Sequence, residues 1–177
     1  SFRKNIMAIL PIIIAPDPRL KRKAETVEAV DTEIGELMAN MLETMYLAPG
    51  IGLAAPQIGV LKRVIVLDIT KGKGPPDPIC MANPEITWRS DEEVTYEEGC
   101  LSLPEQFDQV TRPAKIRVSF LNKENMQQEC EADGLLATCI QHEMDHLTGT
   151  LFVDHLSHLK RGMILRKLKK LKKLNAS

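Results

Sequence analysis

The sequence predicts one α+β domain in which mainly antiparallel sheets fold around a central helix. Three observations lead to this fold class: an amphipathic helix pattern near the N-terminus, a series of short strand-like segments after it, and two helix patterns near the C-terminus. The length of 177 residues suits one domain, and the 44% of hydrophobic and 27% of charged residues are ordinary for a globular protein. The composition excludes a disordered chain, a collagen-like fibre and a disulfide scaffold.

The first helix is predicted to begin after Asp31, which has the side chain of an N-cap residue. Behind it, apolar residues recur at steps of three and four, and this spacing predicts one stripe of a helix of about four turns. The stripe consists of Ile34, Leu37, Met38, Met41, Leu42 and Met45. Residues 49–52 (Pro-Gly-Ile-Gly) are expected to end this helix and to open a loop.

Strands are predicted over residues 64–69, 79–88, 94–101, 115–121 and 126–132, with turns between them. Residues 71–78 are rich in Gly and Pro and are expected to form a turn region. Asp133 is predicted to cap a helix over residues 134–147 that stops near Gly149. Residues 157–174 place Leu, Ile and Met among Lys and Arg, which predicts an amphipathic basic helix at the C-terminal end.

Charge and cysteine usage limit the class of protein further. All 24 acidic residues lie in the first 154 positions, whereas the charged residues of the rest of the chain are all Lys or Arg. The longest apolar stretch, residues 6–15, contains Pro11 and has ten residues, and a membrane span needs ~20. Signal-peptide features are weak, so we expect a cytoplasmic protein. The four cysteines have no CxxC spacing and are predicted to be thiols.

The strongest chemical signal is the segment His142-Glu143-Met144-Asp145-His146. On a helix, residues four apart share a face, so both imidazoles can reach one metal ion. Glu143 then lies beside the open side of that ion, which is the arrangement of a metallohydrolase with two ligands and a general base. The alternative is an amphipathic helix with two histidines and a solvated glutamate.

The identity of a third ligand separates the classes of metalloenzyme. Metzincins continue to a third histidine, but Phe152 stands at that position, and no glutamate follows Glu143 as it does in thermolysin-like enzymes. Cys100, at the end of a predicted strand, is an upstream candidate. The downstream candidates are Asp154, His155 and His158.

Three motifs in this order resemble those of bacterial peptide deformylases of the type 1 class. Residues 50–57 read GIGLAAPQ, residues 98–102 read EGCLS and residues 141–146 read QHEMDH. The resemblance covers almost all of residues 7–173. We therefore expect residues 7–177 to form a single catalytic domain, with residues 1–6 as an extension or cloning remnant and Met7 as the natural start.

The resemblance implies one divalent metal ion per chain, with Cys100, His142 and His146 as ligands and a water in the fourth position. The ligand types alone favour zinc, although imidazole also suits iron and nickel. The resemblance implies Fe(II) as the native metal. Because iron bound to a thiolate is easily lost to oxidation, a purified protein is expected to carry Zn(II) or Ni(II) instead.

The implied reaction removes the N-formyl group from the initiator methionine of a nascent polypeptide and releases formate. By resemblance, the metal-bound water is the nucleophile, and Glu143 takes its proton and delivers it to the leaving amine. The side-chain amide of Gln57 and the backbone N–H of Leu101 are expected to donate to the oxyanion. Losing one such donor typically costs ~100–1,000-fold in rate.

The substrate-binding residues are also expected from the resemblance and from the backbone freedom of glycine. Residues 50–52 fit an extended peptide that lies along a loop, and main-chain groups of Ile51, Gly52 and Gly99 are expected to bind it. An apolar pocket would take the methionine side chain. The predicted substrate-binding residues are Gly50, Ile51, Gly52, Tyr96, Glu98, Gly99, Leu135, Thr138 and Cys139, with His142 in the pocket wall.

Two residues are candidates for supporting the metal ligands. Glu98 and Arg112 are expected to pair and brace the loop that carries Cys100, the alternative being a plain surface ion pair. Asp145 is either a second support or part of the helix surface. The basic tail is predicted to contact the ribosome, and a solvated amphipathic helix is the alternative. No DNA partner and no membrane association are expected, and we expect the protein to be a monomer.

Two other functions remain open at this level. One is a noncatalytic ribosome- or RNA-associated protein with a structural metal, although a structural site is normally closed by four protein ligands. The other is a zinc endopeptidase that uses the two histidines with Asp154 or His155. Replacement of Cys100 by Ala separates the deformylase from the endopeptidase, because the latter would keep its metal and activity.

Overall fold

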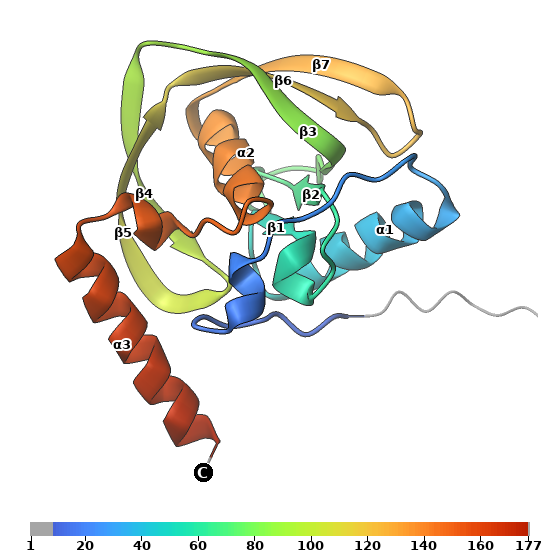
Figure 1. Ribbon diagram of the computed structural model, residues 1–177. Coiled ribbons are helices and arrows are strands. Elements are labelled where there is room, and N and C mark those ends of the chain that lie inside the picture. The colour runs from blue at the N-terminus through green and yellow to red at the C-terminus, as the bar shows by residue number, and fades with distance from the viewer. Residues whose placement is uncertain (1–8, 177) are drawn as a thin grey trace, which may run out of the picture.

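The computed structural model describes residues 9–176 and has the predicted α+β architecture. Residues 1–6, the predicted extension, lie outside the described residues. Helix α2 lies at the centre of the molecule, with strands curving around it and α1 and α3 outside (Figure 1). The helices are α1 (Thr32–Leu47), α2 (Gly134–His146) and α3 (His158–Asn175), with short 3-10 turns η1 (Pro18–Lys21), η2 (Ala55–Ile58) and η3 (Phe152–His155).

Seven strands form two antiparallel sheets within the described part of the chain. The larger sheet has the order β1-β2-β3-β6-β7, and β4 and β5 form a separate two-stranded sheet. The strands are β1 (Gly52–Ala54), β2 (Val64–Leu67), β3 (Ile79–Arg89), β4 (Glu93–Cys100), β5 (Leu103–Pro113), β6 (Lys115–Leu121) and β7 (Gln127–Asp133).

Most predicted elements are confirmed, and their ends have the expected caps. The Asp31 side chain accepts a hydrogen bond from the backbone N–H of Ile34 at the start of α1, and Ser157 accepts one from Lys160 at the start of α3. The prediction that Asp133 caps α2 is correct in position but wrong in the expected hydrogen bond. This residue occupies the N-cap position of α2, but its side chain makes no capping hydrogen bond.

Two strands are absent from the prediction. Strand β1 lies where a loop was expected, and its three residues pair with β2 through Gly52 opposite Leu67. Strand β5 pairs with β4 along most of its length, yet most of its side chains are polar and few of them are buried. Only Leu103, Val110 and Arg112 of this strand are buried, so the apolar alternation that marks a strand is weak.

The two buried faces of α2 explain how the helix positions the site. One face carries Ala137, Ile140 and Leu147 into an apolar core shared with β2, β3 and β6. The other carries His142 and His146 and remains polar although it is buried. Packing on the first face therefore fixes the direction in which the second face points.

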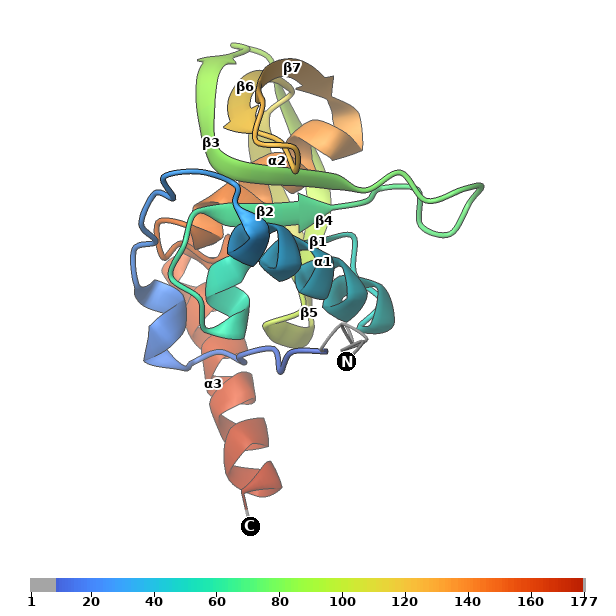
Figure 2. The ribbon, with the colours of Figure 1, turned by 90° about the vertical axis from the view of Figure 1, so that its right-hand side faces the viewer.

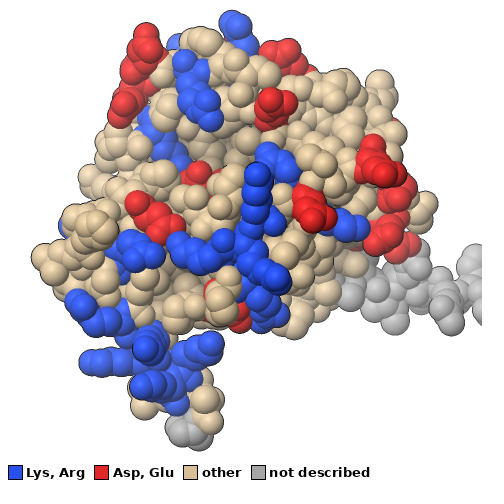
Figure 3. All heavy atoms as spheres, viewed as in Figure 1, with Lys and Arg blue, Asp and Glu red and all other residues tan. Residues whose placement is uncertain are grey.

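Helix α3 projects from the rest of the molecule (Figures 1 and 2). Its buried residues are Ile164 and Leu168, which pack against Leu103 and Val110 of β5 and against η3. Lys and Arg side chains gather over α3 in the space-filling view (Figure 3). Among residues 9–176, no helix combines the length and the apolar character that crossing a bilayer requires.

Candidate metal centre and active site

The structure brings Cys100, His142 and His146 together in one group. Cys100 is the last residue of β4, and the two histidines lie one turn apart on α2. One ligand atom from each residue lies within 4.8 Å of the other two, and Cys100 Sγ is 3.3 Å from His146 Nε2. The three side chains are therefore close enough to hold one metal ion.

Two further properties of this group fit a divalent transition metal. One thiol and two imidazoles form a donor set that suits zinc, iron or nickel. Three buried side-chain atoms of the described residues have no hydrogen-bond partner, namely Thr138 Oγ1, Glu143 Oε2 and His146 Nδ1. Glu143 is the one of these residues whose carboxyl group adjoins the ligands, since its Oε1 lies 3.6 Å from His142 Nε2, so its unpartnered oxygen lies at this group.

Glu98 orients His142 by binding Nδ1 of its imidazole ring. Its carboxylate accepts two hydrogen bonds from Arg112, of 2.7 and 2.8 Å, and its Oε1 is 2.8 Å from His142 Nδ1. Burial opposes ionisation, but the hydrogen bonds from Arg112 and His142 lower the pKa of Glu98 to about 2. An ionised carboxylate only accepts hydrogen bonds. His142 Nδ1 therefore carries a proton, and Nε2 is the ring atom left for a metal.

Burial and neighbouring charges also shift the pKa values of the α2 side chains. Burial raises the pKa of Glu143 to about 7, and the partial charge on His142 opposes this increase. Burial by itself lowers the pKa of His142, but hydrogen bonds to Cys100 and Glu98 raise it well above its ordinary value. Burial lowers the pKa of His146. A metal bound at His142 must therefore displace a proton.

A cleft of about 940 Å³ opens beside this group. Leu101, His142 and Glu143 line it together with Cys100. All nine predicted substrate-binding residues also line it: Gly50, Ile51, Gly52, Tyr96, Glu98, Gly99, Leu135, Thr138 and Cys139. A cleft of this size admits an extended peptide with a large side chain.

Gln57 lies beside the metal group but does not line the cleft. Its side chain is buried, and its Oε1 accepts a hydrogen bond from the backbone of Ala54. Its Nε2 donates to Ser102 Oγ at 3.0 Å and lies 3.4 Å from Cys100 Sγ. The amide is therefore held at the sulfur of Cys100, and Ser102 is a partner that sequence reasoning missed.

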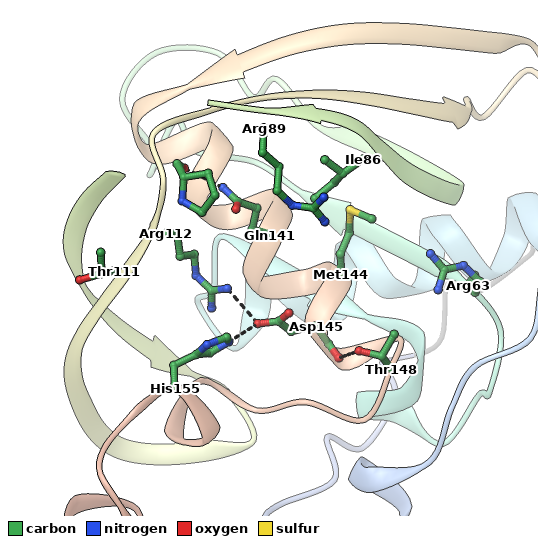
Figure 4. A pocket seen from close by; sticks show the side chains of 11 residues that line it. Arg63, Ile86, Arg89, Thr111, Arg112, Gln141, Met144, Asp145, Thr148 and His155 are labelled. Carbon is green, nitrogen blue, oxygen red and sulfur yellow. Dashed lines mark hydrogen bonds and ion pairs between the residues drawn. The ribbon is translucent and has the colours of Figure 1, made fainter. Parts of the chain in front are cut away.

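The supporting residues form a longer network than the sequence indicated. Arg112 and Glu98 pair as expected, and Arg112 Nη1 also lies 2.8 Å from Asp145 Oδ2. His155 Nε2 is 2.8 Å from the same oxygen (Figure 4). Asp145 is thus bound on two sides. Sequence reasoning missed this contact, because Asp145 and His155 are ten positions apart and no helical or strand spacing links them.

Sequence reasoning also missed the residues that β5 adds to the cleft. Phe107 is 61% exposed and lies over the backbone of Gly99, where an added Cβ would be 2.3 Å from Phe107 Cε1. Pro104 and Glu105 line the same side. These residues were missed because strand β5 was not predicted from the sequence, and only its pairing with β4 places these side chains at the cleft.

The fold and the site together define a class: an α+β enzyme with a Cys/His metal-binding group on a central helix. A family model described as "Polypeptide deformylase" matches residues 9–162, and the chain belongs to this family. The peptide deformylase of Methylocella silvestris is 57% identical over 173 residues, which cover 96% of this chain and 88% of that protein. That of Phenylobacterium zucineum is 56% identical over 93% of this chain and 97% of the relative.

Solved structures of the family have the same fold. The crystal structure of peptide deformylase from Ehrlichia chaffeensis matches with a TM-score of 0.91 at 39% identity, covering 96% of this chain and all of that one. The same enzyme in complex with actinonin matches with a TM-score of 0.87 at 42% identity, covering 92% and 97%. The predicted family and α+β fold class are therefore confirmed.

Proposed function

We propose that this protein removes the N-formyl group from the initiator methionine of nascent polypeptides and releases formate. The observation that carries this proposal is the position of Glu143. Its carboxyl group is buried, lines the cleft, and has its Oε1 3.6 Å from His142 Nε2, a member of the Cys100–His142–His146 group. Membership of the polypeptide deformylase family supports the same reaction.

One divalent metal ion would be held by Cys100, His142 and His146. We propose Fe(II) as the native ion and Zn(II) or Ni(II) as substitutes in purified protein, because sulfur and imidazole donors accommodate all three. When bound, such an ion lowers the pKa of a water molecule and polarises a carbonyl oxygen. Glu98 contributes by keeping the proton of His142 on Nδ1.

Glu143 is the proposed general base and acid. A carboxylate near its pKa can accept a proton from the attacking water and then return it to the leaving amine. Burial raises the pKa of Glu143 to about 7 in the metal-free protein, and a bound cation would lower it, so the carboxyl group would be ionised near neutral pH and able to accept the proton. Its Oε2 has no partner among the described residues, so this oxygen is available for the proton transfer.

The proposed donors to the oxyanion and to the substrate backbone lie at the rim of the cleft, apart from Gln57, which lies beside Cys100 without lining the cleft. We propose that the N–H of Leu101 and the Nε2 of Gln57 donate to the oxyanion, since Gln57 already lies at Cys100 Sγ. The backbone of residues 50–52 and of Gly99 would bind an extended peptide. The methionine side chain would enter the part of the cleft lined by Ile51, Tyr96, Leu135, Thr138, Cys139 and His142.

The basic face of α3 supports a second part of the proposal, contact with the ribosome in the cytoplasm. Lys and Arg side chains gather over this projecting helix on the face seen in Figure 3, and phosphate groups attract such a surface. We further propose that the protein acts as a monomer. Binding to ribosomes that weakens with added salt, and is lost when α3 lysines are neutralised, would support the contact.

The endopeptidase alternative has less support from the geometry. Asp154 is occupied by Lys21 and Arg161, with contacts of 2.6 and 2.8 Å. His155 is bound to Asp145. Neither residue belongs to the group that could hold the metal, so the third donor of this group is Cys100.

The decisive experiment measures formate release from a formyl-Met tripeptide by anaerobic enzyme loaded with Fe(II) or Ni(II). An acetyl-Met tripeptide serves as the control substrate. We expect release from the formyl peptide alone, and loss of both metal and activity in C100A. The C130A variant removes a thiol from β7, away from the metal group, and should keep both. No formate release by enzyme with one bound metal would refute the proposal.

A further inference from the structure

A second cavity, of about 350 Å³, lies on the other side of α2 (Figure 4). It shares no lining residue with the cleft at the metal group. On α2, Gln141, Met144 and Asp145 face this cavity, whereas His142 and Glu143 face the cleft. Because successive helical residues are ~100° apart, these sets occupy opposite faces. The remaining walls come from β3, β5, η3 and the segment before β2.

Positive charge exceeds negative charge in this cavity. Arg63, Arg89 and Arg112 line it, and Asp145 is the acidic residue among its lining residues. Arg112 already pairs with both Glu98 and Asp145. Arg63 and Arg89, by contrast, form no ion pair with a carboxylate anywhere in residues 9–176. Two guanidinium groups are thus left without a charged partner.

The guanidinium of Arg63 is fixed in place and partly removed from water. Its Nη2 donates to the backbone oxygen of Pro84 at 2.7 Å. Burial lowers the pKa of Arg63, and the carboxylate of Glu85 offsets this effect only in part. A partly desolvated cation with free N–H donors gains more from an oxyanion than a fully solvated one does.

The lining also contains an apolar portion beside the arginines. In Figure 4, the side chains of Ile86 and Met144 lie between Arg89 and Arg63. A mixture of cationic donors, one of them held in place at Pro84, and apolar wall is typical of sites for small organic anions. The volume is large enough for a ligand of several non-hydrogen atoms.

We propose that this cavity binds a small oxyanion, a carboxylate or phosphate group carrying a short apolar portion, through Arg63 and Arg89. The ligand would lie against Ile86 and Met144. One wall of the site is the Arg112–Asp145 pair. The occupant would therefore lie beside Arg112, which in turn binds the Glu98 carboxylate at His142, and it would lie outside the cleft at the metal group.

The test is an anion titration of the metal-loaded full chain, followed by ¹H–¹⁵N NMR at constant ionic strength. Inorganic phosphate and butyrate are the two probes, and chloride maintains the ionic strength. We expect saturable shifts of the amides of Ile86, Met144 and Thr148, with those of Gly52 and Gly99 unchanged. Tighter binding of phosphate would assign a phosphate ester as the ligand class, and tighter binding of butyrate an organic acid.

Matched variants separate a specific site from general attraction by positive charge. R63Q/R89Q should weaken binding about tenfold or more, which is ~1.4 kcal/mol. K169Q/K170Q removes the same charge from exposed positions on α3 and should leave the affinity within about twofold. The proposal is overturned by shifts that do not saturate, by shifts confined to Gly52 and Gly99, or by equal weakening in both double variants.

Discussion

Glu98 Oε1 lies 2.8 Å from His142 Nδ1, and this contact joins the two-stranded sheet to the central helix at the metal group. The same carboxylate receives two hydrogen bonds from Arg112. Because Arg112 holds Glu98 ionised, Glu98 fixes both the orientation and the protonated nitrogen of His142. The metal group is therefore arranged by a neighbouring ion pair before any metal binds.

Removal of the Glu98 charge is expected to weaken metal binding. In E98Q the amide no longer holds the proton of His142 on Nδ1 with the same strength, and losing such a partner typically costs ~10–100-fold in affinity or activity. Competition with a chelator measures the affinity. E93Q removes an exposed carboxylate from the same strand and is the control. Equal affinities of E98Q and the parent protein would contradict the proposed role.

The pKa of Glu143 gives a prediction about pH. Burial places this pKa at about 7, and a base must be ionised, so activity should fall as pH decreases below the pKa. A bound cation favours the ionised form and lowers the pKa. We therefore expect ¹³C NMR to give about 7 for Glu143 in metal-free protein and a lower value in loaded protein. E143Q should lose ~100-fold or more in kcat and still bind metal.

An alanine at Gly52 is expected to displace the carboxylate of Glu143, the proposed general base. Its Cβ would lie 2.9 Å from Glu143 Cδ and 3.0 Å from Cys139 Sγ, and both side chains are buried. A displacement of about 1 Å at a reacting group can cost ~100-fold in rate. Kinetics of G52A should therefore show a loss in kcat. At Gly35 in α1 an added Cβ meets nothing within 4 Å, so G35A should keep full activity.

The sequence predicted the two histidines of the metal group and the helix that carries them because both depend on local spacing, whereas Cys100 was assigned only by the resemblance of its motif. Two histidines four residues apart must share a helical face, wherever the helix packs. The contact of Glu98 with His142 could not be predicted in this way, since it joins residues 44 positions apart. Phe107 was missed for a related reason. Its place at the cleft depends on pairing in register with Gly99, which the polar sequence of β5 does not indicate.

Asp154 is expected to stabilise the junction between η1, η3 and α3 in a pH-dependent manner. Its carboxylate accepts hydrogen bonds from Lys21, Arg161 and the backbone of Leu151. Burial opposes ionisation, but these contacts lower the pKa of Asp154 below its ordinary value of 3.8. D154N should therefore lose about 1 kcal/mol of unfolding free energy at neutral pH, because half-exposed ion pairs contribute little each.

The pH dependence of this loss follows from the direction of the pKa shift. A carboxyl group whose pKa is lowered in the folded state adds its full contribution to the free energy of unfolding above its unfolded pKa of 3.8. This contribution disappears as pH falls through the folded-state pKa. Urea unfolding of the parent protein and D154N should thus differ at pH 7 and converge in strong acid. D91N removes an exposed carboxylate before β4 and should match the parent protein throughout. A D154N deficit that persists unchanged in strong acid would show that the charge of Asp154 does not stabilise this junction.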